Sequence, residues 1–236
     1  MTRQIEKLSV FLPAYNEEAN LKRTVKNVVE NLQKNVSEWE IVIVNDGSKD
    51  QTGKIADDLA RANKKIHVIH HSPNRGYGAA FKSGLYGCKY PWISFIDSDG
   101  QFNFKEISRF IDTQEKTCAD MVIGFYLGRK VSFTRKLNSK IWQLIVYLLF
   151  GLNVKDIDCG FKLISKKVVD TIPKLESERG AFISSEFLIK AKKDSFKIVE
   201  IGVQHYPRKF GEATGAKLNV IIQSFIDLFK LWQKIR

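Results

Sequence analysis

Cysteine, proline and methionine are scarce in this chain of 236 residues, which has three Cys, five Pro and two Met. Cys88, Cys118 and Cys159 are odd in number, widely spaced and without a Cys-x-x-Cys pair, which argues against a disulfide framework or a zinc site. The chain also lacks any apolar run of roughly 18 residues, so no transmembrane helix is expected. Its first ten residues lack the apolar core of a signal peptide, and we therefore expect reduced thiols in a cytosolic setting.

Acidic residues are outnumbered by basic ones. The chain has 38 Lys and Arg against 26 Asp and Glu, a formal net charge of +12. This excess predicts an anionic partner, which can be a nucleic acid, a phosphorylated small molecule or an acidic membrane surface. No nucleic-acid-binding motif accompanies the charge and the lysines are spread over several expected helices, so we expect no nucleic-acid partner.

Short apolar runs alternate with helical patterns through the first half of the chain. Strands are predicted at residues 8–15, 40–46, 66–70, 92–99 and 121–124, with helices at 17–35, at 48–61 and ending near residue 88. This alternation predicts an α/β fold with a Rossmann-like, mostly parallel central sheet flanked by helices. No Pro/Gly/Ser linker divides the chain, which indicates a single domain over residues 1–236.

The second half begins with a stretch that contains no acidic residue. Residues 121–155 hold six Lys or Arg and include the apolar run Ile141–Leu152, which is too short to span a bilayer. Periodicity does not decide whether this run is a buried core helix or a surface-seeking one. Residues 218–232 predict an amphipathic helix that packs on the domain, the more common case, or lies in a membrane interface.

Polar side chains follow four of the predicted strands. In an open α/β sheet, ligands bind in the crevice at the carboxyl ends of the strands, so these side chains are expected to converge there. They are Asn16 and Glu17, Asp46, Asn74 and Arg75, and Asp97 and Asp99.

The pair Asp97 and Asp99 is the sharpest of these features. Side chains two positions apart at a strand end point the same way, and two like charges so close require a cation or hydrogen-bond donors. A hard divalent ion suits them, and Gln101 can add an oxygen ligand. A solvated turn and part of a calcium loop are the alternatives, although Ser108 stands where an EF-hand has its last glutamate.

Two other motifs leave alternatives open. Asp46 can accept a hydrogen bond from a base or a ribose hydroxyl, or it can belong to a helix cap in which Ser48 or Asp50 serves the next helix. The segment 74–80 contains a Gly-x-Gly at the start of a helix, as in dinucleotide-binding proteins. Phe81 occupies the third glycine position, and a nicotinamide oxidoreductase therefore stays a minor alternative.

Six motifs in order resemble one enzyme family. LPAYNEE (12–18), VNDGS (44–48), NRG (74–76) and DSD (97–99) resemble the family 2 inverting glycosyltransferases of GT-A fold. DIDCGF (156–161) and HYPR (205–208) are similar to the branch of dolichyl-phosphate mannose synthases and polyprenyl-phosphate glycosyltransferases. The resemblance runs from about Ser9 to Lys217. Members of this branch often carry transmembrane helices after the catalytic domain, and none is expected here up to Arg236.

The resemblance implies a nucleotide-binding half up to about residue 124 and an acceptor half over about 125–236. It implies that the nucleotide sugar contacts Pro13, Ala14, Tyr15, Glu17, Asp46, Arg75, Gly76, Asp97, Ser98, Asp99 and Arg208. It implies that Mg²⁺ or Mn²⁺ is held by Asp97, Asp99 and Gln101. It implies catalytic roles for Asp99, Arg129, Arg135, Glu186 and Asp158, with Asp156 as the alternative to Asp158.

The implied reaction is metal-dependent, inverting transfer from GDP-mannose or a UDP-hexose to a polyprenyl phosphate, in cell envelope glycan biosynthesis. A lipid monophosphate is largely dianionic at neutral pH, so it needs positioning by the basic stretch 129–140 more than it needs a base. The enzyme is then expected on the cytosolic face of an anionic membrane. A soluble family 2 transferase acting on a saccharide hydroxyl, with Asp158 or Glu186 as base, is the main alternative. A binding-only protein with a degenerate site is a third.

Overall fold

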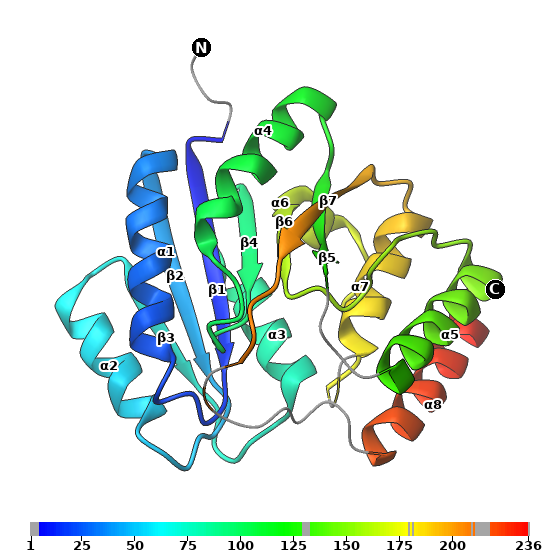
Figure 1. The fold of residues 1–236 in the computed structure, drawn as a ribbon, viewed down its shortest axis with the longest axis horizontal. Helices are drawn as coiled ribbons and strands as arrows, with labels where there is room; N and C mark the ends of the chain where they lie inside the picture. Colours follow the sequence, from blue (N-terminus) through cyan, green and yellow to red (C-terminus); the bar gives the residue numbers. More distant parts are fainter. Residues whose placement is uncertain are drawn as a thin grey trace.

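The computed structural model describes residues 5–128, 133–178, 180, 182–208, 210 and 218–235, with the backbone alone for 133–136 and 218–221 (Figure 1). The strands are β1 (Lys7–Ala14), β2 (Glu38–Asn45), β3 (Ile66–His70), β4 (Trp92–Ile96), β5 (Met121–Leu127), β6 (Phe161–Ser165) and β7 (Ile198–Gln204). The helices are α1 (Leu21–Asn35), α2 (Thr52–Ala62), α3 (Tyr77–Gly87), α4 (Ile107–Thr117), α5 (Phe133–Phe150), α6 (Lys166–Thr171), α7 (Phe182–Lys193) and α8 (Leu218–Ile235), with a 3₁₀ turn η1 (Phe104–Glu106).

One mixed sheet crosses the whole molecule. Its strand order over the described residues is β3-β2-β1-β4-β6-β5-β7. Strands β1 to β4 are parallel to one another, and β6 runs antiparallel to both of its neighbours, with Trp92 of β4 opposite Ser165 of β6. The chain order reverses between β1 and β4, which is the switch point at which doubly wound sheets bind ligands.

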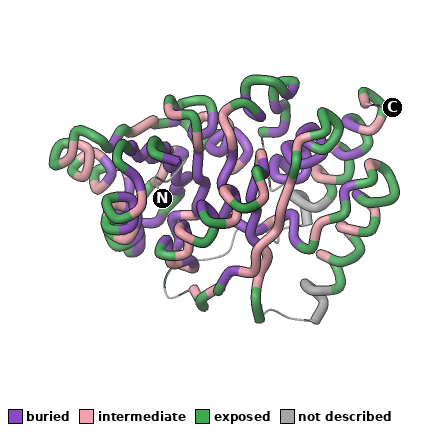
Figure 2. The backbone as a smooth tube through the Cα atoms, turned by 90° about the horizontal axis from the view of Figure 1, so that it is seen from above, coloured by how far each residue is buried: buried purple, intermediate pink, exposed green. Residues whose placement is uncertain are grey.

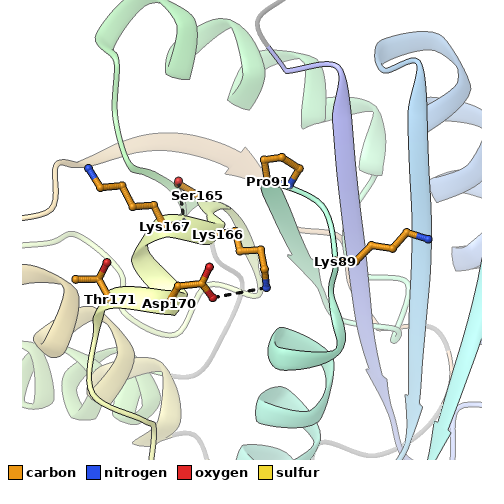
Figure 3. Close-up of a pocket in the computed structure, with 7 residues that line it drawn as sticks. All are labelled: Lys89, Pro91, Ser165, Lys166, Lys167, Asp170 and Thr171. Atoms are coloured by element: carbon orange, nitrogen blue, oxygen red, sulfur yellow. Dashed lines mark hydrogen bonds and ion pairs between the residues drawn. The ribbon is translucent and has the colours of Figure 1, made fainter.

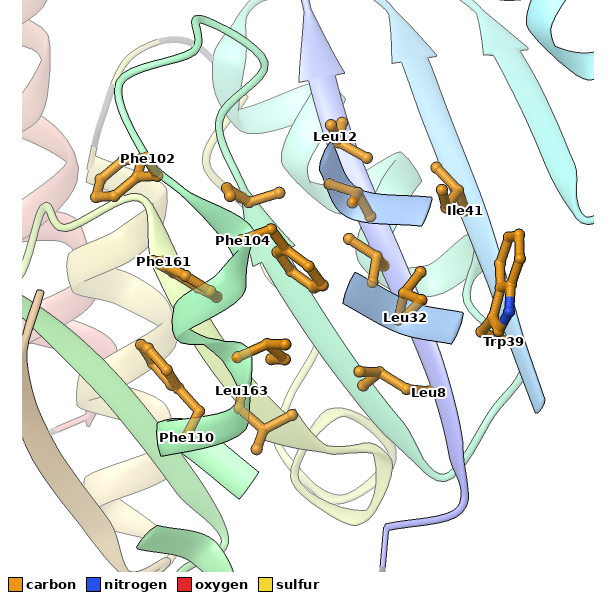
Figure 4. Packing of buried hydrophobic residues seen from close by; sticks show 14 of the residues in the cluster. Leu8, Leu12, Leu32, Trp39, Ile41, Phe102, Phe104, Phe110, Phe161 and Leu163 are labelled. Atoms are coloured by element: carbon orange, nitrogen blue, oxygen red, sulfur yellow. The ribbon is translucent and has the colours of Figure 1, made fainter. Parts of the chain in front are cut away.

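Helices cover both faces of this sheet and enclose two apolar cores. The first core lies between the sheet and α1, α2, η1 and α4, and it includes the aromatic stack of Phe110 on Phe161, with ring centroids 4.3 Å apart (Figure 4). The second core lies between the other face and α3, α6 and α7. Seven of the eight residues of β1 and of β2 are buried, as expected for parallel strands covered on both sides.

Helices α5 and α8 lie side by side at one end of the molecule (Figure 1). The ring of Trp142 on α5 contacts Phe182 on α7 and Phe225 on α8, with centroids 6.1 and 5.2 Å apart. Val146, Leu228 and Leu231 are buried, but the outer sides of both helices are exposed, as the green stretches of Figure 2 near the C-terminus show. The apolar run from residue 141 is therefore a packed helix with one face open. Within the described residues, no helix is both long and apolar enough to cross a membrane.

The expected α/β architecture is confirmed, and so are the five predicted strands. Strands β6 and β7 and helices α4, α6 and α7 were not predicted individually. The first helix begins at Leu21 rather than at residue 17, because Asn16 has a positive φ of 54° and Glu17 belongs to the loop after β1. Strand β6 comes from the second half of the chain yet lies between β4 and β5, so the two halves share one sheet.

Candidate active site

A cluster of carboxylates and one arginine lies at the switch point of the sheet. Glu17 follows β1, Asp99 follows β4, and Arg208 comes from the segment after β7. One nitrogen of the Arg208 guanidinium is 3.1 Å from Glu17 Oε1 and the other is 2.7 Å from Asp99 Oδ2. Burial raises the pKa of Glu17, which hydrogen bonding to Asn20 and the charge of Arg208 only partly oppose. The predicted convergence at the carboxyl edge is confirmed for Glu17 and Asp99, and Arg208, which the strand-end pattern did not include, joins them.

Asp97 lies next to this cluster in a tightly built position. Its Oδ1 accepts a hydrogen bond from the Tyr77 hydroxyl at 3.2 Å, and its backbone N–H donates to the Gly160 carbonyl at 3.3 Å. A Cβ on Gly160 would come within 2.0 Å of Asp97 Oδ2, so only glycine allows β6 to approach this closely. Burial first, and then the charge of Asp99, raise the pKa of Asp97 to about 7, although Lys162 lowers it. A further positive charge beside Asp97 would favour its ionised form.

Ser98 and Gln101 have partners that the motif alone does not reveal. The Ser98 hydroxyl donates to the Pro13 carbonyl at 2.7 Å and so joins β4 to β1. The Gln101 amide donates to the Tyr206 carbonyl at 3.0 Å, and Tyr206 N–H donates to the Gln101 carbonyl at 2.9 Å. Gln101 thereby holds the segment that carries Arg208. The geometry favours these structural roles over the predicted donor contact of Ser98, while a metal-ligand role for Gln101 stays a prediction.

The donor set at this cluster suits a hard divalent cation. No three His, Cys, Asp or Glu side chains within the described parts of the chain form a ready-made metal site. Asp97 and Asp99 nevertheless offer carboxylate oxygens, and Mg²⁺ is typically bound by one or two carboxylates together with substrate phosphates. The Arg208 guanidinium on Asp99 shows that a cation is stable at this position. The residues thus fit a metal ion whose remaining ligands would come from a bound phosphate group.

The loops after β1 and β2 are joined by several hydrogen bonds. Asn16 N–H donates to Ser48 Oγ at 3.0 Å, and Glu17 N–H donates to Thr52 Oγ1 at 2.8 Å. Asp50 accepts from Thr52 N–H at 2.9 Å, although the N-cap of the following helix is Gln51, whose side chain makes no capping hydrogen bond, so neither Ser48 nor Asp50 is the N-cap residue. Tyr15 is exposed at the rim of this loop, directly after Pro13 and Ala14 at the buried end of β1.

Asp46 holds the loop that precedes α3. Its carboxylate accepts from four donors, which are the backbone N–H groups of Arg75 and Gly76, the side-chain amide of Asn74 and the ring of His71, at 2.6 to 3.0 Å. Only 3% of the residue is exposed. The predicted contact with a base stays a prediction, but the structure assigns Asp46 first to the loop 74–76. The Arg75 side chain reaches Glu178 at 3.3 Å.

The predicted acceptor residues divide into three groups. Asp158 lies near Tyr77. Burial and Asp97 are the main causes of the raised pKa of Tyr77, and the charge of Asp158 adds a smaller effect. Asp158 therefore belongs to the edge of the cluster. The neighbouring Asp156 is buried, and its Oδ1 accepts from Asp158 N–H at 3.0 Å. Arg129 lies outside the described residues. Arg135 belongs to the first turn of α5, but its side chain also lies outside the description.

Glu186 is an internal anchor. The carboxylate is 2% exposed and accepts from the Lys190 ammonium at 2.7 Å, from the Ser177 hydroxyl and backbone N–H, and from Glu176 N–H. Burial raises its pKa, but Lys190 and Ser177 lower it further, so the group is held ionised below its usual range. These contacts favour an anchoring role over the predicted catalytic one.

A hollow of about 490 Å³ lies at the opposite edge of the sheet, where β4 begins and β6 ends (Figure 3). Two of the three lysines that line the hollow form ion pairs with carboxylates. Lys89 Nζ is 3.1 Å from Glu40, and Lys166 Nζ is 3.7 Å from Asp170 and 3.1 Å from the Cys88 carbonyl. The hollow is therefore separate from the carboxylate cluster and adds nothing to it.

The sequence reasoning missed three contributors to the site. The His71 ring, the Tyr77 hydroxyl and the fully buried Lys162 each act on Asp46 or Asp97. Tyr77 lies inside the segment 74–80 that the sequence analysis singled out, so this residue could have been named as a candidate from the sequence. No periodicity or motif indicated that Lys162, on the core strand β6, would be buried behind Asp97.

Comparisons with known proteins bear on the identity of the chain. The sequence profile described as Glycosyl transferase family 2 matches residues 9–172, more than half of the chain. A dolichyl-phosphate beta-glucosyltransferase of Dictyostelium discoideum is 31% identical over 90% of this chain and 68% of its own length. A polyprenol monophosphomannose synthase of Mycolicibacterium smegmatis is 28% identical over 92% and 84%.

Among solved structures, the glucosyl-3-phosphoglycerate synthase of Mycobacterium tuberculosis in complex with Mn²⁺, UDP-glucose and glycerol 3-phosphate superposes with a TM-score of 0.67. It is 18% identical and covers 98% of this chain and 77% of that protein. At this identity the likeness shows the fold alone, and it confirms the GT-A fold expected from the sequence.

Proposed function

Because the chain belongs to glycosyl transferase family 2 and is a glycosyltransferase of GT-A fold, we propose that it transfers a hexose from a nucleotide sugar to a polyprenyl phosphate, with inversion and with a divalent metal ion. The observation that carries the proposal is the Glu17, Asp97, Asp99 and Arg208 cluster at the carboxyl ends of β1 and β4. The sequence relatives named for transfer to dolichyl or polyprenyl phosphate support the acceptor class.

The cluster can stabilise a departing nucleoside diphosphate. In the proposed step, an acceptor phosphate oxygen forms a bond to the anomeric carbon while the bond from that carbon to the diphosphate breaks on the opposite face. Asp97 and Asp99 would hold Mg²⁺ or Mn²⁺, which would supply positive charge against the charge that grows on the diphosphate. Arg208 leaves Asp99 when the donor binds and contributes a second cation, because arginine matches phosphate oxygens in a bidentate manner. The Mn²⁺ in the mycobacterial synthase accords with this role.

The proposed acceptor needs no general base. A phosphate monoester has a second pKa near 6 and is largely dianionic at neutral pH, so it is already a nucleophile. This suits the position of Glu186, whose carboxylate is engaged by four donors and whose pKa is held below its usual range, so that it is a poor candidate for a base. Asp158 at the edge of the cluster is the base that a saccharide hydroxyl would require, and it keeps that alternative testable.

The exposed outer sides of α5 and α8 fit a membrane-bound acceptor. Eight large apolar side chains on the two helices are between 43% and 71% exposed and form what we call the α5–α8 face: Leu137, Ile141, Leu144, Leu148, Ile222, Phe225, Ile226 and Phe229. Lys140 and Lys230 are exposed beside it. Apolar side chains flanked by lysines, on a chain of net charge +12, are typical of helices that lie in an anionic interface. We therefore propose peripheral association with the cytosolic face of a membrane.

The test is nucleotide release from UDP- and GDP-hexoses with Mg²⁺ or Mn²⁺, with and without a short-chain polyprenyl phosphate. Release that rises with the lipid phosphate for one donor supports the proposal and identifies the sugar. Release that responds to saccharides but not to the lipid would transfer the assignment to the saccharide alternative. A variant Asp99→Asn is the matched control, because it removes one metal ligand without changing side-chain size.

A further inference from the structure

A buried chain of hydrogen bonds runs from α3 to the end of β2. His71 Nε2 is 2.9 Å from the Ser83 hydroxyl, and His71 Nδ1 is 2.6 Å from Asp46 Oδ1. The side chains of His71 and Asp46 are each 4% exposed. In a neutral ring, Nδ1–H donates to the carboxylate and Nε2 accepts from the Ser83 hydroxyl, which satisfies every group of the chain.

The far side of the same carboxylate holds a backbone loop. Arg75 N–H donates to Asp46 Oδ1 at 3.0 Å, and Gly76 N–H donates to Oδ2 at 2.9 Å. The loop also packs closely on the turn that follows β2, since a Cβ on Gly47 would lie 2.6 Å from Asn74 N. The position of Asp46 therefore sets the position of residues 74–76.

This loop continues directly into the carboxylate cluster. Gly76, with a φ of 100°, precedes Tyr77, the first residue of α3, whose hydroxyl is 3.2 Å from Asp97 Oδ1. A shift of the loop would carry Tyr77 away from Asp97. We propose that His71 and Ser83 are positioning residues for the donor, acting through Asp46 and Tyr77 on the nucleotide wall and on Asp97. This inference rests on the donor site proposed above.

The order hydroxyl, imidazole and carboxylate also occurs in serine hydrolases, where it activates the hydroxyl. Here Ser83 lies in the middle of α3, and Asp46 is shared with three further donors from the loop 74–76. The imidazole thus fixes the carboxylate in one orientation, and the arrangement transmits position from α3 to the loop.

The experiment compares His71→Leu, His71→Asn and Ser83→Ala with His67→Leu, a control on the half-exposed histidine of β3, the strand that ends one residue before His71. Amide hydrogen exchange is measured at residues 75 and 76 in the free protein, and calorimetry gives the Kd of UDP and GDP with Mn²⁺. His71→Leu is expected to speed exchange at both amides and to weaken nucleotide binding by about tenfold. His71→Asn keeps a donor near Nδ1 and is expected to restore most of both. Ser83→Ala should weaken binding by about threefold.

Unchanged amide exchange at residues 75 and 76 in His71→Leu would overturn the inference. An equal loss of exchange protection and of nucleotide affinity in His71→Asn, or in the His67→Leu control, would overturn it too. If His71→Leu does not fold, Ser83→Ala decides, because it removes the hydrogen bond to the His71 ring and leaves Asp46 and its other donors in place. Wild-type exchange at residues 75 and 76 together with an unchanged Kd for the nucleotide then contradicts the proposal. Hydrogen exchange needs no acceptor and no turnover, so a failure of the proposed transfer reaction is distinguishable from a failure of this inference.

Discussion

Arg208 is expected to compete with the metal ion for Asp99. Its guanidinium bridges Glu17 and Asp99 at 3.1 and 2.7 Å, and its side chain is 23% exposed. A sheltered hydrogen bond to a charged group contributes about 1.5–3 kcal/mol and an exposed ion pair less, so the two contacts together stabilise the bridged state by about 1–2 kcal/mol. Replacement by alanine removes this competition, and Mn²⁺ binding without nucleotide should strengthen by roughly 5- to 30-fold.

The assay is a titration of Mn²⁺ into nucleotide-free protein, with free Mn²⁺ followed by electron paramagnetic resonance. Arg109→Ala is the matched control, because Arg109 is also ion-paired, to Glu106 at 2.6 Å, but outside the cluster. Turnover of Arg208→Ala should fall by about a hundredfold, since the leaving diphosphate loses a cation. Unchanged or weaker Mn²⁺ binding in Arg208→Ala would refute the reasoning, because Asp99 would then not be a metal ligand.

The remaining predictions concern the cluster, the internal anchor and the exposed face. Asp99→Asn should reduce metal-dependent transfer by at least about a hundredfold while leaving circular dichroism and Tm unchanged, and wild-type turnover would remove the metal assignment. Glu186→Ala leaves the Lys190 ammonium buried without its carboxylate partner, with only the Lys174 carbonyl as acceptor among the described residues, and should lower the free energy of unfolding by about 3–5 kcal/mol, measured with urea. Phe229→Asp should reduce flotation with anionic vesicles but leave the Kd of the nucleotide unchanged; equal flotation would contradict the proposed membrane contact. Because the folded pKa of Asp97 is raised to about 7, metal-free protein should lose stability as the pH rises from about 4 to 7, and urea unfolding of Asp97→Asn should lack that slope.

The positions of the first five strands and the acidic strand ends were predictable because each depends on local sequence. A run such as EIVIVND has β-branched residues suited to a buried strand and a carboxylate where the chain leaves it. The pair Asp97 and Asp99 was recognisable for the same reason. Parallel strands then bring such ends to one edge without further information.

The partners of those side chains were not predictable, because they come from distant parts of the chain. Gln101 and Tyr206 are 105 positions apart, and Glu17 and Arg208 are 191 apart. Glu186 has the carboxyl side chain that a catalytic acid needs, and only the four hydrogen-bond donors around it identify it as an anchor. The exposed face of α5 was equally hidden, since a helix that is apolar on nearly all sides does not show which side is covered.

The place of β6 in the sheet has a consequence for protein engineering. Residues 161–165 pair with β4 on one side and with β5 on the other, and Gly160 beside them touches the Asp97 carboxylate. A chimera that exchanges acceptor specificity by a crossover near residue 124 would replace the strand that supports Asp97. Grafting α5 and the segment from β7 to α8 as separate inserts keeps that pairing intact, and such designs should retain nucleotide binding where the simple fusion loses it.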